Sequence, residues 1–434
     1  MTKESFWKLV SLSGVPFIMV LGNSMLIPVF PEMQKAMSIS PFQAGLTITF
    51  FSLPAGIAIP IMGFLADKIG RKKIIVPSLI IYGLGGIISG LAPIIFNKSF
   101  TILLTGRVIQ GIGAAGTAPI AMALVSDIFT SAERSKAQGT LESANGLGKV
   151  ISPVLGAAIA LIIWYALFFV YAFLAIPIAL AIWLVIKEPE FQAKNQSLAA
   201  YMSKIKSIFQ NTGPSLAGSY AAGSTVLLVL FGIMSYLSDL LETDFGLKGI
   251  VKGLALAAPV LAMSITAFFS GKYLEKKQKQ MKSFILAGLL LVAASLATMS
   301  IFPASLALLA GVLSTGIGTG LVLPAVNTMV TSSCRLEERG GITALYGGVR
   351  FIGVAAGPPS FSFLLGYSKK TMFSLGAILP VLAFLLAWWL IHEEDVLQKE
   401  KPKNEKKSPG PVHRELSPLK ESMAMLFHVR RKNK

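Results

Sequence analysis

A short basic segment separates two apolar runs that are each long enough to cross a membrane. The runs cover residues 41–62 and 74–96, and about 20 apolar residues make a helix that spans the roughly 30 Å of hydrocarbon in a bilayer. The segment between them, residues 63–73, reads GFLADKIGRKK and holds four basic side chains and one carboxylate. Because basic residues in short loops favour the cytoplasmic face, we expect a tight turn between two membrane helices here.

Apolar runs bounded by charged and turn residues continue along the chain and predict twelve membrane spans. With 53% hydrophobic and 14% charged residues, a chain of 434 residues has too little polar surface for a water-soluble fold. We therefore expect an all-α membrane protein. The predicted spans are 12–31, 42–64, 74–96, 100–125, 138–162, 164–186, 215–241, 250–270, 282–303, 305–331, 342–367 and 371–391.

The distribution of positive charge predicts the orientation of these spans. With the N-terminus inside, thirty of the 39 Lys and Arg residues fall on the inner side. This asymmetry predicts a multi-pass protein of the cell membrane with both termini in the cytoplasm. The net charge of +18 is likewise explained by cations that contact membrane lipids, so we expect no nucleic-acid partner. Six cations are expected in the outer loops: Lys35, Lys98, Lys248, Lys252, Lys369 and Lys370.

Cysteine and histidine usage excludes several kinds of site. Cys334 is the only cysteine, which rules out an internal disulfide and a Cys/His metal cluster. The three histidines follow the last predicted span, so no membrane-embedded histidine can relay protons. The sequence also contains no nucleophile paired with a base and no phosphate-binding loop. We therefore expect neither an enzyme nor a metal site or cofactor.

An internal repeat divides the chain into two halves. The segment ERSKAQG at Glu133 matches ERGGITA at Glu338, an offset of 205, and several glycines and a proline match at the same offset. The predicted parts are a six-helix bundle (1–186), a cytoplasmic linker (187–214), a second bundle (215–391) and a charged cytoplasmic tail (392–434). We expect the tail to be disordered, and a short amphipathic helix on the membrane at its end is the alternative.

The 63–73 loop resembles the signature loop between the second and third helices of the major facilitator superfamily. The matching positions are Gly63, Asp67, Gly70 and Arg71. The resemblance implies twelve helices in two pseudo-symmetric halves, a solute site between them, a monomer, and an ion gradient as the energy source. It also implies that Asp67 acts in a gate on the inner face.

The fourth predicted span contains a second match, LLTGRVIQGIGAAG. It resembles the family's Arg-x-x-Gln-Gly-x-Gly motif, whose arginine is linked to proton transfer, and thereby implies this role for Arg107. Gln110 lies on the same helical face, three residues on. The alternative is a structural arginine that binds backbone carbonyls and holds the bundle together.

The fifth predicted span resembles the motif found in antiporters of this superfamily. The matching residues are Gly148, Pro153 and Gly156, while Ser152 and Ala157 replace two glycines with other small residues. The resemblance to this motif implies the drug:proton antiporter branch of the superfamily, and with it the export of small organic solutes driven by a proton gradient. Glycine and proline are common in membrane helices in general, which is the alternative explanation.

Four ionisable side chains lie inside the spans: Arg107, Glu142, Lys149 and Arg350. Each costs roughly 2.5 to 3.5 kcal/mol at mid-bilayer, so we expect them to face partners or a hydrated cavity. Glu142, Asn145, Gly146, Lys149 and Pro153 share one helical stripe. We interpret Glu142 as the coupling proton site. The alternative is an acid at the inner end of the span that pairs with Arg134 or Lys136.

The charges expected in the cavity indicate the chemical class of the solute. Asn23 stands where many exporters of cationic drugs carry an acid, and the three basic residues outnumber Glu142. A cavity lined by Asn23, Gln110, Asn145, Lys149 and Arg350 would favour small anionic or phenolic solutes, such as a catecholate siderophore. The alternatives are a broad multidrug efflux pump, an organic-anion uptake symporter and a lipid flippase of the same fold. Sodium is the alternative to protons as the coupling ion, because a carboxylate can bind either.

Overall fold

The structure is a computed structural model that describes residues 3–96, 98–129, 131–188, 198–302, 305–333 and 339–394. Every regular element in these ranges is a helix. The charged tail beyond residue 394, Cys334 and the Glu338 end of the repeat lie outside the described residues. The helices are α1 (Lys3–Ser24), η1 (Ile27–Val29), α2 (Phe30–Met37), α3 (Pro41–Ile69), α4 (Lys72–Ile95), α5 (Phe100–Ala115), α6 (Ala118–Ile128), α7 (Ser131–Ala160), α8 (Ala166–Val185), α9 (Leu198–Thr243), α10 (Gly249–Lys276), η2 (Gln278–Gln280), α11 (Met281–Ile301), α12 (Ser305–Ser332), α13 (Arg339–Leu365) and α14 (Lys369–Leu390).

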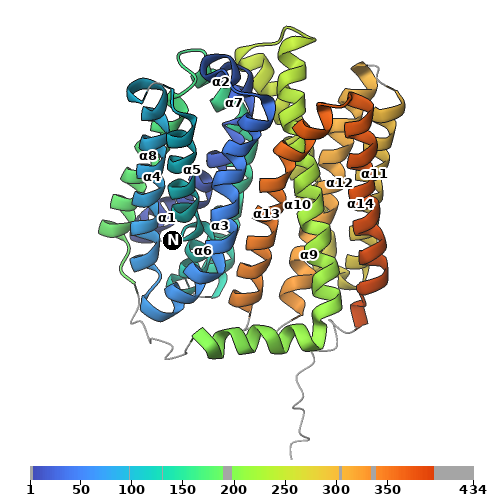
Figure 1. Ribbon diagram of the computed structural model, residues 1–434. Coiled ribbons are helices and arrows are strands. Elements are labelled where there is room, and N and C mark those ends of the chain that lie inside the picture. The colour runs from blue at the N-terminus through green and yellow to red at the C-terminus, as the bar shows by residue number, and fades with distance from the viewer. Residues whose placement is uncertain are drawn as a thin grey trace, which may run out of the picture.

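Figure 1 shows two groups of upright helices side by side, α1–α8 on the left and α9–α14 on the right. The groups meet where α3 packs on α13 and α7 packs on α10. We call the end of the bundle that carries the 63–73 loop the loop end, at the bottom of Figure 1, and the opposite end the far end. The predicted all-helical fold in two halves is confirmed.

Eleven segments among the described residues are long and apolar enough to span a membrane. Some of these segments are a single helix or part of one, and others are a run of shorter helices. The predicted fifth span corresponds to α7, which is not among them because of the polar residues that it carries, among them Asn145 and Lys149. α7 nevertheless packs between α1 and α10 inside the bundle. A helix that lines a polar interior needs fewer apolar residues than one that faces lipid, which explains the shortfall.

Two predicted spans are broken into shorter helices. α1 ends at Ser24 and is followed by η1 and α2, which have prolines in their first turns. α5 likewise ends at Ala115, and α6 begins just before Pro119. Proline lacks the backbone N–H that a continuous helix needs, so each break occurs where a proline follows. Both segments were predicted as single spans, so these breaks were not predicted.

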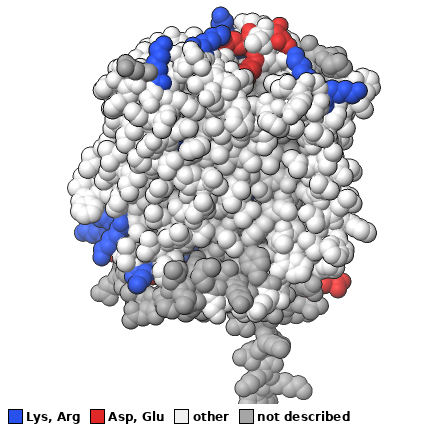
Figure 2. Space-filling model, in the orientation of Figure 1, with Lys and Arg blue, Asp and Glu red and all other residues white. Residues whose placement is uncertain are grey.

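The surface reflects the membrane environment. Charged side chains gather at the two ends of the molecule in Figure 2, and the side between them is white. Large apolar residues such as Trp183, Phe269 and Trp389 are exposed on the helices. The predicted linker is partly helical, because α9 begins at Leu198, and its first part lies across the loop end (Figure 1).

The two halves share a contact that was not predicted from the sequence. In the first half, Lys72 donates from its Nζ to the carbonyls of Trp183 and Ile186, and its backbone N–H donates to Glu188. In the second half, Lys282 donates in the same way to Trp388 and Ile391, and its N–H donates to Glu393. The three acceptor residues are related by the offset of 205 found in the sequence. This equivalence supports the internal repeat.

Candidate functional site

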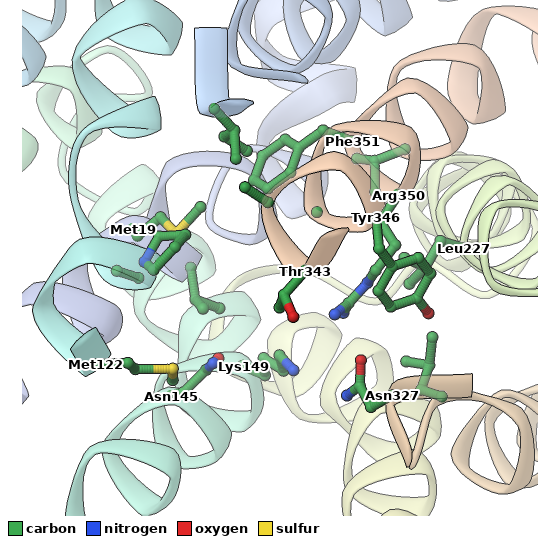
Figure 3. A pocket seen from close by; sticks show the side chains of 18 of the residues that line it. Met19, Met122, Asn145, Lys149, Leu227, Asn327, Thr343, Tyr346, Arg350 and Phe351 are labelled. Carbon is green, nitrogen blue, oxygen red and sulfur yellow. The ribbon is translucent and has the colours of Figure 1, made fainter. Parts of the chain in front are cut away.

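A cavity of about 560 Å³ lies between the two groups of helices. Its walls come from both halves, and its lining extends from the middle of the bundle to Asp67, Arg71 and Gly340 at the loop end. The lining is mainly apolar, with a few polar groups directed inward (Figure 3). A cavity of this size with a few convergent polar groups is typical of a binding site for a small molecule.

α7 supplies one polar wall of the cavity. Glu142, Asn145, Lys149 and Pro153 all line it, as expected for residues three, four or more positions apart on one helical face. Gly146 belongs to the same predicted stripe but is not among the lining residues. The Oδ1 atom of Asn145 is buried without a hydrogen-bond partner among the described residues. Orphaned acceptors of this kind are costly, and a bound solute or water would satisfy this one.

α13 supplies the opposite polar wall. Arg350 lies over the ring of Tyr346, with 5.5 Å between the guanidinium carbon and the ring centroid. Figure 3 shows Lys149, Arg350, Thr343 and Asn327 pointing into the same space. Within the described part of the chain, the side chains of Lys149 and Arg350 form no ion pair or hydrogen bond with another residue. Two cations from different halves are therefore available to one solute.

The sequence analysis missed the polar residues Thr343 and Asn327, which also line the cavity. Uncharged polar residues were considered only in the first, fourth and fifth predicted spans, whereas Asn327 and Thr343 lie in the tenth and eleventh. A search for any polar side chain inside a predicted span would have found both.

Arg107 lies behind the cavity wall rather than on it, because it is fully buried and absent from the lining. Its Nε donates to the carbonyl of Thr47 (2.9 Å), its Nη1 to Oε1 of Gln110 (2.6 Å) and its Nη2 to Oδ1 of Asn23 (2.8 Å). The guanidinium also stacks on Phe51 at 4.4 Å from the ring centroid. Bonds to a backbone carbonyl and two neutral amides hold the charge in a fixed position.

This network corrects the expected lining of the cavity. Gln110 is fully buried and does not line it, since its side chain accepts from Arg107. Asn23 does line it, and its Nδ2 donates to Ser52 (2.7 Å). The charge count changes as well, because Lys149 and Arg350 face Glu142 without Arg107. Two basic residues rather than three therefore share the cavity with Glu142, and their net charge together is +1 when all three are ionised.

The 63–73 loop forms part of the loop end. Arg71 pairs with Asp127 of α6, and its backbone N–H donates to Glu188 (2.5 Å). Asp67 lies 3.9 Å from Arg71. Gly70 has a φ of 111°, a left-handed conformation that favours glycine. Gly63, Asp67 and Arg71 all line the cavity at this end.

The predicted antiporter motif packs α7 tightly between two neighbours. A Cβ on Gly156 would collide with the carbonyl oxygen of Met25, and a Cβ on Gly148 would lie 3.2 Å from Phe17. On the α10 side, Gly253 packs against the carbonyl of Pro153. Ser152 is fully buried. The small residues of the motif therefore permit close contact with α1 and α10.

Five charged residues close the far end of the bundle, and we call them the far-end cluster: Glu32, Lys35, Asp239, Glu242 and Lys252. Lys35 of α2 pairs with Glu242 of α9 (2.7 Å), which joins the two halves. Lys252 of α10 also pairs with Glu242 (2.9 Å) and lies 3.7 Å from Glu32. The placement of Lys252 in an outer loop was wrong, because it lies in the first turn of α10 and is 1% exposed.

Membrane-length helices surround a central cavity into which a few polar groups converge. The lining of this cavity reaches one end of the bundle and ion pairs close the other end, and this arrangement defines a membrane transporter. The chain matches the family model described as Major Facilitator Superfamily over residues 12–358 and again over residues 220–433. It therefore belongs to the major facilitator superfamily, and it is a transporter rather than an enzyme.

Individual relatives agree with this family. The chain is 36% identical over 398 residues to the "Bacillibactin exporter" of Bacillus subtilis (strain 168), covering 91% of this chain and 98% of the relative. It is 30% identical over 240 residues to "Multidrug resistance protein 2" of the same organism, covering 55% of this chain and 57% of the relative. Among solved structures, a bacterial homolog of the human lysosomal transporter Spinster, in an inward-facing and unoccupied conformation, matches with a TM-score of 0.72. That match has 18% sequence identity, covers 92% of this chain and 98% of that chain, and supports the fold.

Proposed function

We propose that this transporter exports small acidic or phenolic metabolites by proton antiport across the cell membrane, with the loop end and both termini in the cytoplasm. A siderophore is the leading example of such a solute. The cavity then receives the solute from the cytoplasm, and the far end opens to release it outside.

The observation that carries this proposal is the pair Lys149 and Arg350. The two cations come from different halves, line one cavity and are free of ion pairs with other described residues. An unpaired charge in a largely apolar cavity is costly, and a carboxylate or phenolate is the partner that offsets this cost. A lipophilic cation would add to the positive charge, which disfavours it here.

The direction of transport rests on two supports. The relative that matches nearly the whole chain is named as an exporter of bacillibactin. The close packing of Gly148 and Gly156 is also what the antiporter motif requires. Both supports count against an uptake symporter for organic anions, because the relative is named as an exporter and the motif resembles that of antiporters.

Glu142 is the proposed coupling site, because it is the carboxylate on the same wall as Lys149. A proton on Glu142 makes the cavity more positive and therefore attracts an anion. The proton and the solute therefore do not exclude each other by competing for one position. Antiport instead requires that the protonated transporter and the solute-loaded transporter favour opposite-facing states. We propose that the proton-loaded form favours the inward-facing state.

Broad multidrug efflux is the second candidate. It is favoured by the similarity to Multidrug resistance protein 2 and by the apolar part of the lining, which includes Met19, Leu227 and Phe351. Flexible and aromatic side chains of this kind adapt to varied solutes.

Mass spectrometry of spent medium separates the two candidates. Cells with and without the gene are grown with and without iron, and the small molecules outside and inside are compared. One acidic metabolite that disappears outside and accumulates inside is the expected result. If no acidic metabolite changes while resistance to several unrelated drugs falls, the multidrug function replaces the proposal.

A further inference from the structure

The far-end cluster connects the two halves of the transporter where they close. Lys35 of α2 and Lys252 of α10 both donate to Glu242 of α9, at 2.7 and 2.9 Å. Gln34 of α2 donates to Asp239 of α9 at 3.2 Å. Ser238 of α9 also donates to the carbonyl of Ile27 in η1. Opening this end would separate α2 from α9 and break the first of these ion pairs.

The cluster contains more acids than bases. Three carboxylates, those of Glu32, Asp239 and Glu242, share two ammonium groups. Lys252 is 1% exposed and the side chain of Glu242 is 6% exposed, so water screens this pair weakly. If all five groups were ionised, the closed end would hold one surplus negative charge on carboxylates that are at least partly buried.

The hydrogen bonds indicate which carboxylate is surplus. Glu242 accepts from both lysines, and Glu32 lies 3.7 Å from Lys252. Asp239 accepts from the neutral amide of Gln34. In addition, Oε2 of Glu32 is buried without a hydrogen-bond partner among the described residues. One added proton would remove the surplus charge and supply an O–H donor to a cluster that has an orphaned acceptor.

We propose that the far-end cluster binds one proton when this end of the transporter closes, with Asp239 as the residue that holds it. In the open state, water solvates the carboxylates, and all three are ionised near neutral pH. In the closed state, one of them is protonated. Because closing takes up a proton, acid on the far side favours the closed, inward-facing state.

This proton stays on one side of the membrane. It enters when the far end closes and returns to the same side when that end opens. The cluster is therefore a pH-sensitive site separate from Glu142, which we propose as the coupling site. It determines how much of the transporter faces inward at a given external pH.

Other groups near the far end must be considered in any measurement of pH dependence. Asp244 at the end of α9 pairs with Lys369 of α14 (3.0 Å). The hydrogen bond from Lys369 holds the pKa of Asp244 below its usual range, so Asp244 stays ionised between pH 5 and 8. Tyr236 of α9 is buried, and Lys248 at the start of α10 is exposed.

Distances between two spin labels, measured by double electron–electron resonance, test the proposal in the full-length protein in lipid nanodiscs. Cys334 is replaced by serine, and spin labels are attached at Thr101→Cys on α5 and Lys370→Cys on α14, both exposed at the far end. The ratio of the closed to the open population is then measured from pH 5 to 8. All variants also carry Glu142→Gln, which removes the contribution of the proposed coupling site.

The expected ratio falls as pH rises, by up to about tenfold per pH unit, which is the limit for uptake of one proton. Asp239→Asn, which mimics the protonated acid, should keep the end closed and abolish this dependence. Glu32→Gln, a second variant, also removes the surplus charge and should have the same effect. Asp244→Asn is the matched control on the same helix and should leave the dependence unchanged.

Two outcomes overturn the proposal. One is a closed population that falls on acidification, because protonation would then break the ion pairs rather than stabilise the closed end. The other is an Asp239→Asn protein with the unaltered pH dependence. Neither outcome bears on the proposed export function, which concerns Glu142, Lys149 and Arg350.

Discussion

Replacing Arg350 with methionine should weaken the binding of anionic solutes far more than that of neutral ones. Methionine keeps much of the side-chain length and apolar contact but removes the charge. The guanidinium lies over Tyr346 and has no ion-pair partner among the described residues. A bound anion would therefore interact with it directly.

The size of the effect follows from the type of interaction. A hydrogen bond to a charged group contributes about 1.5 to 3 kcal/mol. At about 1.4 kcal/mol for each factor of ten, this loss corresponds to roughly 10- to 150-fold weaker binding. A unit charge pair at about 4 Å and an effective dielectric constant of about 20 gives about 4 kcal/mol, which sets the upper limit. Lys149 remains in the cavity and retains part of the attraction.

A matched pair of ligands isolates the charge. The carboxylate of 2,3-dihydroxybenzoate is anionic, whereas its methyl ester has the same ring and phenols without that charge. Dissociation constants are measured by calorimetry on the purified protein at pH 7. We expect Arg350→Met and Lys149→Met each to weaken binding of the acid by roughly 10- to 150-fold, with the ester changed by less than about threefold.

A cation away from the cavity provides the control. Lys370 is exposed at the far end, and Lys370→Met should bind both ligands as the unmodified protein does. If Arg350→Met weakens acid and ester equally, Arg350 holds the helix in place rather than binding the solute. The cavity would then have no electrostatic preference for an anionic substrate through Arg350.

Two further variants test the coupling site and the packing of α7. Glu142→Gln should abolish solute counterflow driven by an imposed pH gradient in proteoliposomes while leaving solute binding measurable, because the amide cannot release a proton. Gly156→Ala should destabilise the protein by about 1–3 kcal/mol, since its Cβ would collide with the carbonyl of Met25. Thermal unfolding measures this loss, and Gly146→Ala is the control because a Cβ there would have no atom of a neighbouring helix within 4 Å.

Each of these variants has an outcome that contradicts its premise. Normal counterflow in Glu142→Gln would place the coupling proton on another residue. Equal melting temperatures for Gly156→Ala and Gly146→Ala would mean that α1 and α7 are not in close contact near Met25.

Properties of the fold that depend on local sequence could be predicted. The apolar runs, the basic 63–73 loop and the offset of 205 define a two-half membrane bundle before any contact is known. The stripe on α7 was predictable for the same reason, because helical periodicity alone puts Glu142, Asn145 and Lys149 on one face. The helix breaks before Pro28 and Pro119 were missed, although proline gave a local signal for both.

The partners of the buried charges were decided only by the tertiary structure. Arg107 and Lys149 have the same formal charge and both lie within predicted spans. Arg107 is bonded to Thr47, Gln110 and Asn23 behind the cavity wall, whereas Lys149 faces the open cavity. The composition of one helix cannot distinguish these cases, because the acceptors belong largely to other helices.

The partners within the far-end cluster also could not be predicted from the local sequence, because they lie far apart along the chain. The sequence placed Lys35 and Lys252 in separate outer loops, and the structure brings both to Glu242. These residues lie on three helices from two halves, so their proximity depends on how the halves pack. The sequence determined which side chains have to avoid lipid, and the packing of the two halves determined which of them meet.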